Sequence, residues 1–315
     1  LYPINRSLTG DGVRETLAIL GEVIPLEVVS VPTGEKVFDW EIPKEWTVRT
    51  AHVANSTGRK VIDFAKHNLH LVGYSVPVDC KMGLDELDRH LHSLSEQPEA
   101  IPYITSYYKK DWGFCLSHKD REALREDTYH VYIDSELTDG VLNFGECVIR
   151  GETDKEVFLS TYICHPSMVN NELSGPVVAT LIGKWLREKP RKYTYRIAFL
   201  PETIGAVAYI HHNLETLAKK VVSGFNLSCL GDERCYSMVG SRYGDTMADR
   251  IASRELDERA RCGAKTKKYS FLERQSDERQ YCSPGVDLPL VTLCRSRYGT
   301  YPEYHTSLDN FDLVT

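Results

Sequence analysis

The chain has 315 residues, of which 42% are hydrophobic and 26% charged, an ordinary globular composition that is enough for one large domain and a smaller one. Its 38 Lys and Arg against 45 Asp and Glu give a net charge of −7, and its pI is about 5.9. This balance disfavours nucleic acid and anionic membranes as partners of this segment. No apolar run reaches the roughly 18 residues of a membrane span. Because the sequence starts at Leu1 without a signal-peptide pattern, we expect the native chain to extend beyond both ends.

The first elements are a helix and a β-rich segment. Residues 12–24 place apolar side chains at helical spacing, with Asp11 as the N-cap candidate and Pro25 ending the run. In residues 34–105, strand-like runs alternate with turns rich in Gly, Asn and Pro, and a short helix is predicted over 83–95. We therefore predict a small β-rich domain, 34–105, inserted into a main domain made of 1–33 and 106–315.

The main domain alternates strands and helices. Asp139-Gly140 is a hairpin signal between strands predicted at 128–133 and 141–149. Further strands are predicted at 157–163, 195–200, 221–230 and 288–294, and helices at 175–187, 205–219 and 245–260. This order predicts an α/β fold of three layers, in which a mixed, mostly parallel sheet is covered by helices on both faces.

Polar residues follow four of these strands. His165 comes after the strand at 157–163, Glu202 after 195–200, Asp232 after 221–230, and His305 after 288–294. Because active sites of open α/β sheets lie at the carboxyl ends of strands, these residues are expected to converge. Imidazole and carboxylate groups at one edge are what a metal-assisted hydrolase needs.

The order of motifs resembles the zinc aminopeptidase clan with co-catalytic metals: His165, then N-x-x-S-G at 171–175, Glu202, a strand-end Asp, and Y-H-T-x-x-D at 304–309. More closely, the chain resembles the bacterial aminopeptidase-like domain family. The supporting stretches are R-S-L-T-G-D-G at 6–12, I-P-Y-I-T-S-Y-Y at 101–108, W-G-F-C at 112–115, C-H-P-S at 164–167 and S-D-E-R-Q-Y at 276–281. The resemblance implies a zinc-exopeptidase fold and, for relatives, links to surface-polysaccharide or secondary-metabolite pathways.

The candidate metal site departs from the clan's pattern. Asn171 stands where the clan has a bridging Asp, and Thr203 follows Glu202 where the clan has a second acid. A neutral amide bridges two dications poorly because it does not offset their repulsion. The strand-end Asp maps to Asp232 or Ser228, and we favour Asp232. The expected ligands are His165, Asp232 and His305, with Asn171 or Glu172 as a fourth. They suit one zinc ion.

On this reading, Glu202 is the general base that deprotonates a metal-bound water. Tyr304 is a candidate donor to the oxyanion. Asp277, Glu278, Arg279 and Arg242 are candidate substrate-binding residues, as carboxylate and guanidinium groups that recognise an amine or an acid. A two-metal enzyme and a catalytically dead scaffold are the alternatives.

Several residues also have structural interpretations. Nine irregularly spaced cysteines without C-x-x-C fit small apolar residues in a reducing cytosol. Cys164 is read as packing, because a strand neighbour of His165 faces the other side of the sheet. Asp309 is a candidate to orient His305, and His211-His212 is read as surface. The insert could overhang the active site as a lid, or only support the sheet or a dimer contact.

The leading function is hydrolysis of an amide bond in a small amino-acyl or amino-sugar substrate. Partners are expected to be a small molecule or short peptide, with a homo-oligomer as a further expectation, in the cytoplasm. One rival is a non-catalytic module that uses the pocket to bind a ligand or partner. Another is a transferase, in which an amine attacks instead of water.

Overall fold

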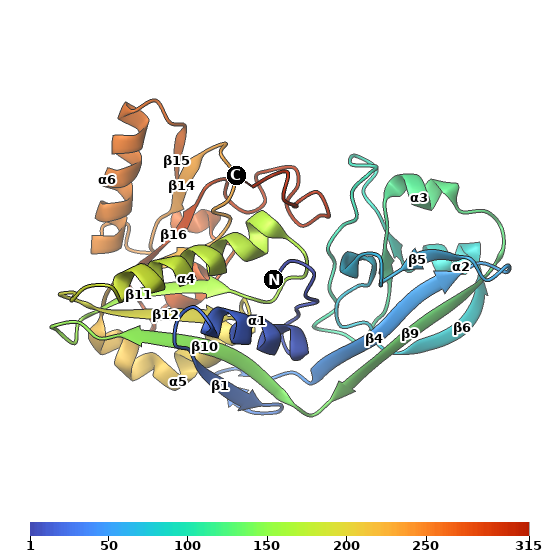
Figure 1. Cartoon of the computed structure of the whole chain (residues 1–315), viewed down its shortest axis with the longest axis horizontal. Helices are drawn as coiled ribbons and strands as arrows, with labels where there is room; N and C mark the ends of the chain where they lie inside the picture. Colours follow the sequence, from blue (N-terminus) through green and yellow to red (C-terminus); the bar gives the residue numbers. More distant parts are fainter. Residues whose placement is uncertain (315) are drawn as a thin grey trace.

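An eight-stranded mixed sheet is the centre of the larger domain in the computed structural model, which describes residues 1–314 (Figure 1). Four neighbouring strands in its middle, β12, β11, β13 and β16, run parallel, whereas β10 and β14 flank them antiparallel. The predicted mixed, largely parallel sheet is therefore confirmed. In spatial order the strands are β1 (Glu27–Pro32), β10 (Val141–Ile149), β12 (Thr194–Leu200), β11 (Glu156–Tyr162), β13 (Val221–Leu227), β16 (Leu290–Cys294), β14 (Tyr236–Val239) and β15 (Thr266–Tyr269).

Helices cover both faces of this sheet (Figure 1). On one face, Leu17 and Ala179 of two helices share a buried core with Leu159 and Ile197 of the sheet. On the other face, Tyr209 stacks on Phe158 at 5.8 Å between ring centroids. The first face carries α1 (Asp11–Gly21), α4 (Ser174–Leu186) and α6 (Met247–Arg261), and the second carries α5 (Ile204–Lys220) and the short α7 (Glu278–Tyr281). Across residues 1–314, no helix is both long and apolar enough to cross a bilayer.

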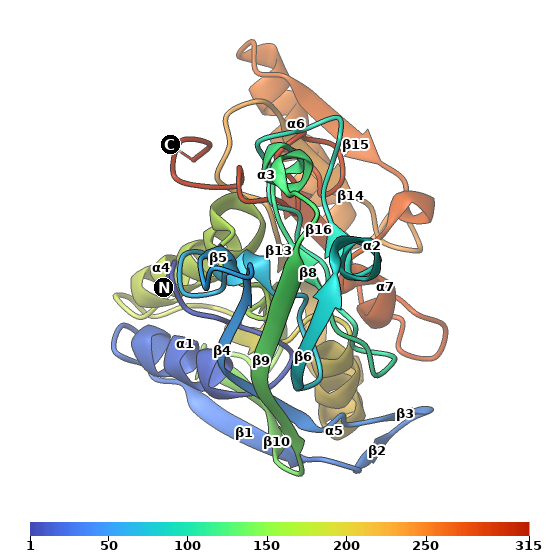
Figure 2. The ribbon, with the colours of Figure 1, turned by 90° about the vertical axis from the view of Figure 1, so that its right-hand side faces the viewer.

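The smaller lobe is built on a four-stranded antiparallel sheet (Figure 2). Its strands are β5 (Lys60–Asp63), β4 (Glu45–Ala54), β9 (Thr128–Thr138) and β6 (Val78–Gly83). We predicted that the insert ends at residue 105, but β9 pairs with β4 and β6, so this lobe extends to Thr138. The alternating burial along β9 explains the pairing, because every second side chain faces the core of the lobe. A turn at Asp139-Gly140 then leads into β10 of the main sheet.

Shorter elements complete the two lobes. The helix predicted over 83–95 is a single turn, α2 (Leu84–Asp88). A two-stranded hairpin, β2 (Lys36–Val37) and β3 (Trp40–Glu41), connects β1 of the main sheet to β4 of the smaller lobe and lies beside α5 (Figure 2). The remaining elements are β7 (Leu91–His92), β8 (Phe114–Cys115), α3 (His118–Ala123), and single turns at η1 (Asn68–His70), η2 (Val169–Leu173) and η3 (Phe271–Glu273).

The parallel strands bring four loops to one edge of the main sheet. These loops follow β11, β12, β13 and β16. Each contains a non-glycine residue with positive φ: Ser167 at 39°, Thr203 at 64°, Cys229 at 50° and His305 at 56°. Such backbone is costly and is retained mainly where a functional arrangement requires it. The segment after β11 also forms a π-helical turn, η2, another feature that is frequent at functional sites.

Candidate functional site

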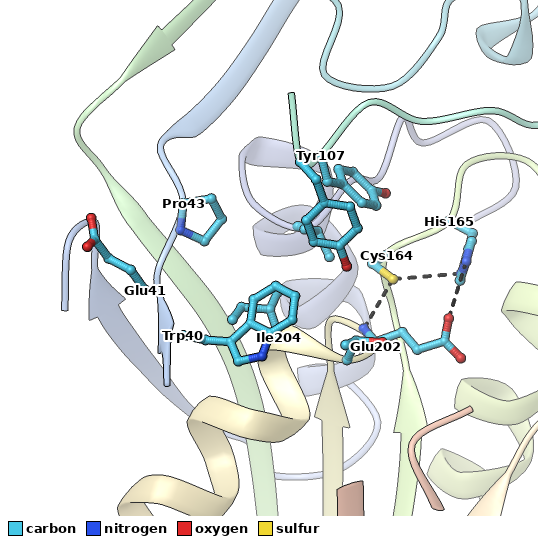
Figure 3. Close-up of a pocket in the computed structure, with 11 residues that line it drawn as sticks. Trp40, Glu41, Pro43, Tyr107, Cys164, His165, Glu202 and Ile204 are labelled. Atoms are coloured by element: carbon cyan, nitrogen blue, oxygen red, sulfur yellow. Dashed lines mark hydrogen bonds and ion pairs between the residues drawn. The ribbon is translucent and has the colours of Figure 1, made fainter. Parts of the chain in front are cut away.

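His165 is held by a carboxylate on one side and faces a second carboxylate on the other. Its Nδ1 lies 3.0 Å from Oε2 of Glu172, and its Nε2 lies 3.6 Å from Oε2 of Glu202 (Figure 3). Burial lowers the pKa of His165, but Cys164 and Glu172 outweigh it and raise the pKa well above its ordinary value. A carboxylate on Nδ1 fixes the ring and leaves Nε2 directed into the site.

Glu172 holds both the ring and the backbone of His165. Its Oε2 also accepts the backbone N–H of His165 at 3.0 Å, and its Oε1 lies 3.2 Å from Nε of Arg6. Arg6 further donates from Nε to the His165 carbonyl at 2.9 Å. Both charged side chains are fully buried. Oε1 accepts no hydrogen bond among residues 1–314 but lies against the Arg6 cation, so Glu172 as the fourth ligand stays a prediction.

Glu202 follows β12 directly and lies where the site opens to solvent. Its side chain is 24% exposed, and Oε1 accepts a hydrogen bond from Ser276 Oγ at 2.6 Å. Burial raises the pKa of Glu202 above its ordinary value, and His165 partly offsets this. A carboxylate with a raised pKa within reach of a pocket suits general-base chemistry.

Asp277 lies behind Glu202 and is fully buried. Its Oδ1 accepts the backbone N–H of Thr203 at 2.7 Å, while Oδ2 has no hydrogen-bond partner among residues 1–314. Burial raises the pKa of Asp277 well above its ordinary value, and the charge of Glu202 raises it further. Asp277 therefore fixes the strained Thr203 backbone beside the general-base candidate, without lining the pocket itself.

His305 lies on the other side of His165, with 5.3 Å between ring centroids. Its buried Nε2 has no hydrogen-bond partner in the described part of the chain. Tyr304 stacks on its ring at 3.9 Å, and Tyr103 packs edge-on against both imidazoles. Burial lowers the pKa of His305 well below its ordinary value, so the ring is neutral. A neutral imidazole is a metal-ligand donor.

The side-chain oxygen of Asn171 is a second buried acceptor without a hydrogen-bond partner among residues 1–314. Its Nδ2 donates to the Tyr162 hydroxyl at 2.8 Å, but Oδ1 has no partner among residues 1–314. Asp309, predicted to orient His305, instead accepts the backbone N–H groups of Asn170 and Asn171 and the Tyr301 hydroxyl. Asp309 therefore shapes the η2 turn that carries Asn171.

Asp232 has a structural role, contrary to its prediction as a ligand. Its Oδ1 accepts from Arg234 N and Ser296 Oγ, and its Oδ2 from Asn170 Nδ2 and Ser296 N, all at 2.8–3.1 Å. Four donors leave this carboxylate no free lone pair for a metal. The alternative, Ser228, hydrogen-bonds the Tyr162 hydroxyl at 2.7 Å.

Three of the predicted ligand groups keep a nitrogen or oxygen without a firm partner. They are Nε2 of His165, Nε2 of His305 and Oδ1 of Asn171, of which the last two are buried without another partner among residues 1–314. Three-ligand zinc sites usually combine imidazole nitrogens with a carboxylate oxygen, so the neutral amide of Asn171 makes this a weaker set for one ion. Within the same range, no cluster of three or more His, Cys, Asp or Glu side chains is arranged to hold a metal.

The other predicted substrate residues do not converge on this pocket. Glu278 is fully buried and accepts from the backbone of Gln275 and Ser276 and from the Tyr298 and Thr292 hydroxyls, so it anchors the loop. Arg242 pairs with Asp287 and lines a different hollow near α6. Arg279 is exposed next to the buried Asp277-Glu278 pair. The role of Tyr304 as the oxyanion donor stays a prediction. Burial raises the pKa of Tyr304, and the nearby charge of Glu202 raises it further.

A cavity of about 160 Å³ leads to Glu202 and His165 (Figure 3). Cys164 lines it, although we read this residue as packing: β11 ends at Tyr162, so the strand alternation no longer applies at 164. Cys164 Sγ accepts the Glu202 N–H at 3.2 Å. Burial raises the thiol pKa, which argues against a nucleophile. The lining residues are Leu8, Trp40, Glu41, Pro43, Tyr107, Tyr108, Cys164, His165, Glu202, Thr203 and Ile204.

Comparisons with known proteins show the family to which the chain belongs. A family model described as "Domain of unknown function (DUF4910)" matches residues 1–315. A Clostridium acetobutylicum protein named "Putative polysaccharide biosynthesis protein with aminopeptidase-like domain" is 46% identical over 310 residues, 98% of this chain and 70% of that protein. A solved structure of a "putative peptidase" from Clostridium acetobutylicum is 45% identical, with a TM-score of 0.96 over 100% of this chain and 73% of the other.

The fold also occurs in a distant enzyme. BSAP, a zinc aminopeptidase from Bacillus subtilis, superposes with a TM-score of 0.68 at 12% identity, over 98% of this chain and 86% of that one. At this identity the likeness shows the fold alone, and it confirms the predicted fold class.

Proposed function

Because the chain belongs to the family described as "Domain of unknown function (DUF4910)" and has the fold of zinc aminopeptidases, we propose that it hydrolyses an amide bond in a small amino-acyl or amino-sugar substrate. The observation that carries the proposal is the pair of Glu202 and His165, 3.6 Å apart at the inner end of a cavity that opens to solvent. The name of the Clostridium relative supports a substrate from polysaccharide synthesis. All nine cysteines are free, which supports a cytoplasmic location.

Glu202 is the group that moves the proton in this proposal. Ser276 holds Oε1, so Oε2 is left to face the cavity and accept a proton from the attacking water. Glu202 then returns that proton to the amine as the C–N bond breaks. Tyr304, stacked on His305, is the candidate donor to the oxyanion.

Zinc would be held by His165, His305 and Asn171. When bound, it would polarise the substrate carbonyl and make the attacking water more acidic. Glu172 and Arg6 would keep the His165 ring in place for this purpose, as a carboxylate on the far nitrogen does for histidine ligands generally.

The test is Glu202→Gln, with Glu215→Gln on the exposed face of α5 as the matched control. We expect Glu202→Gln to lose at least about 100-fold in amide hydrolysis while zinc content, by elemental mass spectrometry, stays near one equivalent. Equal activity of Glu202→Gln and wild type on a cleaved amide would contradict the role of Glu202. No cleavage of any amide by the zinc-loaded chain would leave the rival, a non-catalytic binding module, as the better account.

A further inference from the structure

Aromatic side chains from outside the main domain form the outer wall of the cavity. Trp40 comes from the β2–β3 hairpin, and Tyr107 and Tyr108 come from the loop before β8. Trp40 and Tyr108 meet edge to face, with ring centroids 5.6 Å apart. Figure 3 shows Trp40 and Tyr107 across the cavity from Cys164, Glu202 and His165. The cavity therefore has an aromatic side and a reactive side.

The Tyr107 ring is fixed in position. Its hydroxyl hydrogen-bonds the Tyr103 hydroxyl at 2.8 Å, and its ring packs edge-on against Tyr74 at 5.0 Å. Tyr103 in turn contacts both site histidines. Trp40 and Tyr108 are 37% and 74% exposed, so part of each ring is accessible to a ligand. Aromatic side chains have few rotatable bonds, so they bind rings at a low cost in conformational entropy.

The hairpin that carries Trp40 is held on the main domain against backbone strain. Phe38, in the two-residue turn between β2 and β3, has a φ of 56°, where glycine is normally required. Its ring packs edge-on against His211 of α5 at 5.0 Å, and Glu35 forms an ion pair with His212 at 3.0 Å. Both histidines are exposed, as predicted from the sequence, and they contact the hairpin at the surface of α5. Strain of this kind persists where the resulting position is used.

We propose that Trp40 and Tyr108, with Tyr107 behind them, are a subsite for one ring of the substrate that presents an apolar face. The ring subsite rests on the proposed function, because it binds the part of the substrate that lies next to the amide cleaved with the help of Glu202. The cavity volume of about 160 Å³ sets the size, because a cavity of about 150 Å³ accommodates one benzene molecule. The ring is either aromatic, as in an aryl amino acid, or a pyranose, and both offer an apolar face.

The experiment measures binding by calorimetry in the Glu202→Gln background, where hydrolysis does not interfere. The ligands are alaninamide, phenylalaninamide and N-acetylglucosamine. We expect one of the two ring ligands to bind about three- to ten-fold more tightly than alaninamide, the gain typical of aromatic contacts. Trp40→Leu should abolish that preference, whereas Trp185→Leu, an exposed tryptophan on α4, should keep it. The ring ligand that binds more tightly shows whether the substrate ring is an aryl group or a pyranose.

Ring ligands that bind no better than alaninamide, or a preference that survives in Trp40→Leu, would overturn the subsite. The hydrolase proposal fails separately: preference for a ring that depends on Trp40, without cleavage of any amide by the wild type, supports the subsite and contradicts the hydrolase. Cleavage of an amide without any preference for a ring supports the hydrolase and contradicts the subsite.

Discussion

The buried pair of Arg6 and Glu172 provides the sharpest test of how the N-terminal segment supports the site. Both side chains are fully buried, and Oε1 of Glu172 has no hydrogen-bond partner among residues 1–314 besides its ion pair with Arg6. Arg6→Met would leave a carboxylate in the interior without its cation. It would also remove the donors to the carbonyls of His165 and Leu1. Removing one partner of a buried pair costs about 3–5 kcal/mol.

This loss is a large part of the total stability of about 5–15 kcal/mol. Urea unfolding followed by circular dichroism measures it, and with a slope of about 3 kcal/mol/M the midpoint should fall by roughly 1–1.7 M. Arg254→Met is the matched control, because Arg254 pairs with Glu258 at 83% and 46% exposure, and exposed pairs contribute about 0–1 kcal/mol. A shift for Arg6→Met no larger than that of the control would refute the reasoning. Adding Glu172→Gln to Arg6→Met should recover part of the loss, since no charge is then left buried.

Three further predictions follow from single residues. Burial lowers the pKa of His67 to about 4. Neutral His67 therefore supports about 2 kcal/mol of folding stability above pH 6.5, which is lost as the pH falls toward 4. His67→Asn, which keeps an acceptor for the Leu69 N–H, should flatten the pH profile of the urea midpoint between these values. Asn171→Asp adds a negative charge to the ligand set and should strengthen zinc binding about ten-fold or more, read as a larger zinc-dependent rise in Tm; an unchanged rise would exclude Asn171 from the site. Gly175→Ala places a Cβ 2.5 Å from the Leu227 carbonyl and should lower stability by about 1–3 kcal/mol, measured by thermal unfolding, with Gly21→Ala, where a Cβ meets nothing, as the control.

The sequence was informative where local pattern and parallel topology decide the outcome. Apolar runs that end in polar residues located His165, Glu202 and His305 at one sheet edge, because parallel strands share an edge. It was not informative where a carboxylate's partners decide its role. Asp232 and Glu172 read as ligands, yet Ser296 and Asn170, which are distant in sequence, occupy Asp232, and Arg6 lies against Glu172. Trp40 could not be foreseen, since a two-residue strand carries no periodic signal and its docking depends on α5.

The acids at the strand ends differ in what surrounds them, and this difference singles out Glu202. Glu172 is neutralised by Arg6, and Asp232 is satisfied by four neutral donors. Glu202 has Ser276 on one oxygen and only the edge of His165, at 3.6 Å, near the other. A carboxylate held by one firm hydrogen bond can change its charge state at a lower cost than one held by several. Of these three acids, it is also the one that lines the cavity, which is why the proposed hydrolysis assigns the proton transfer to Glu202.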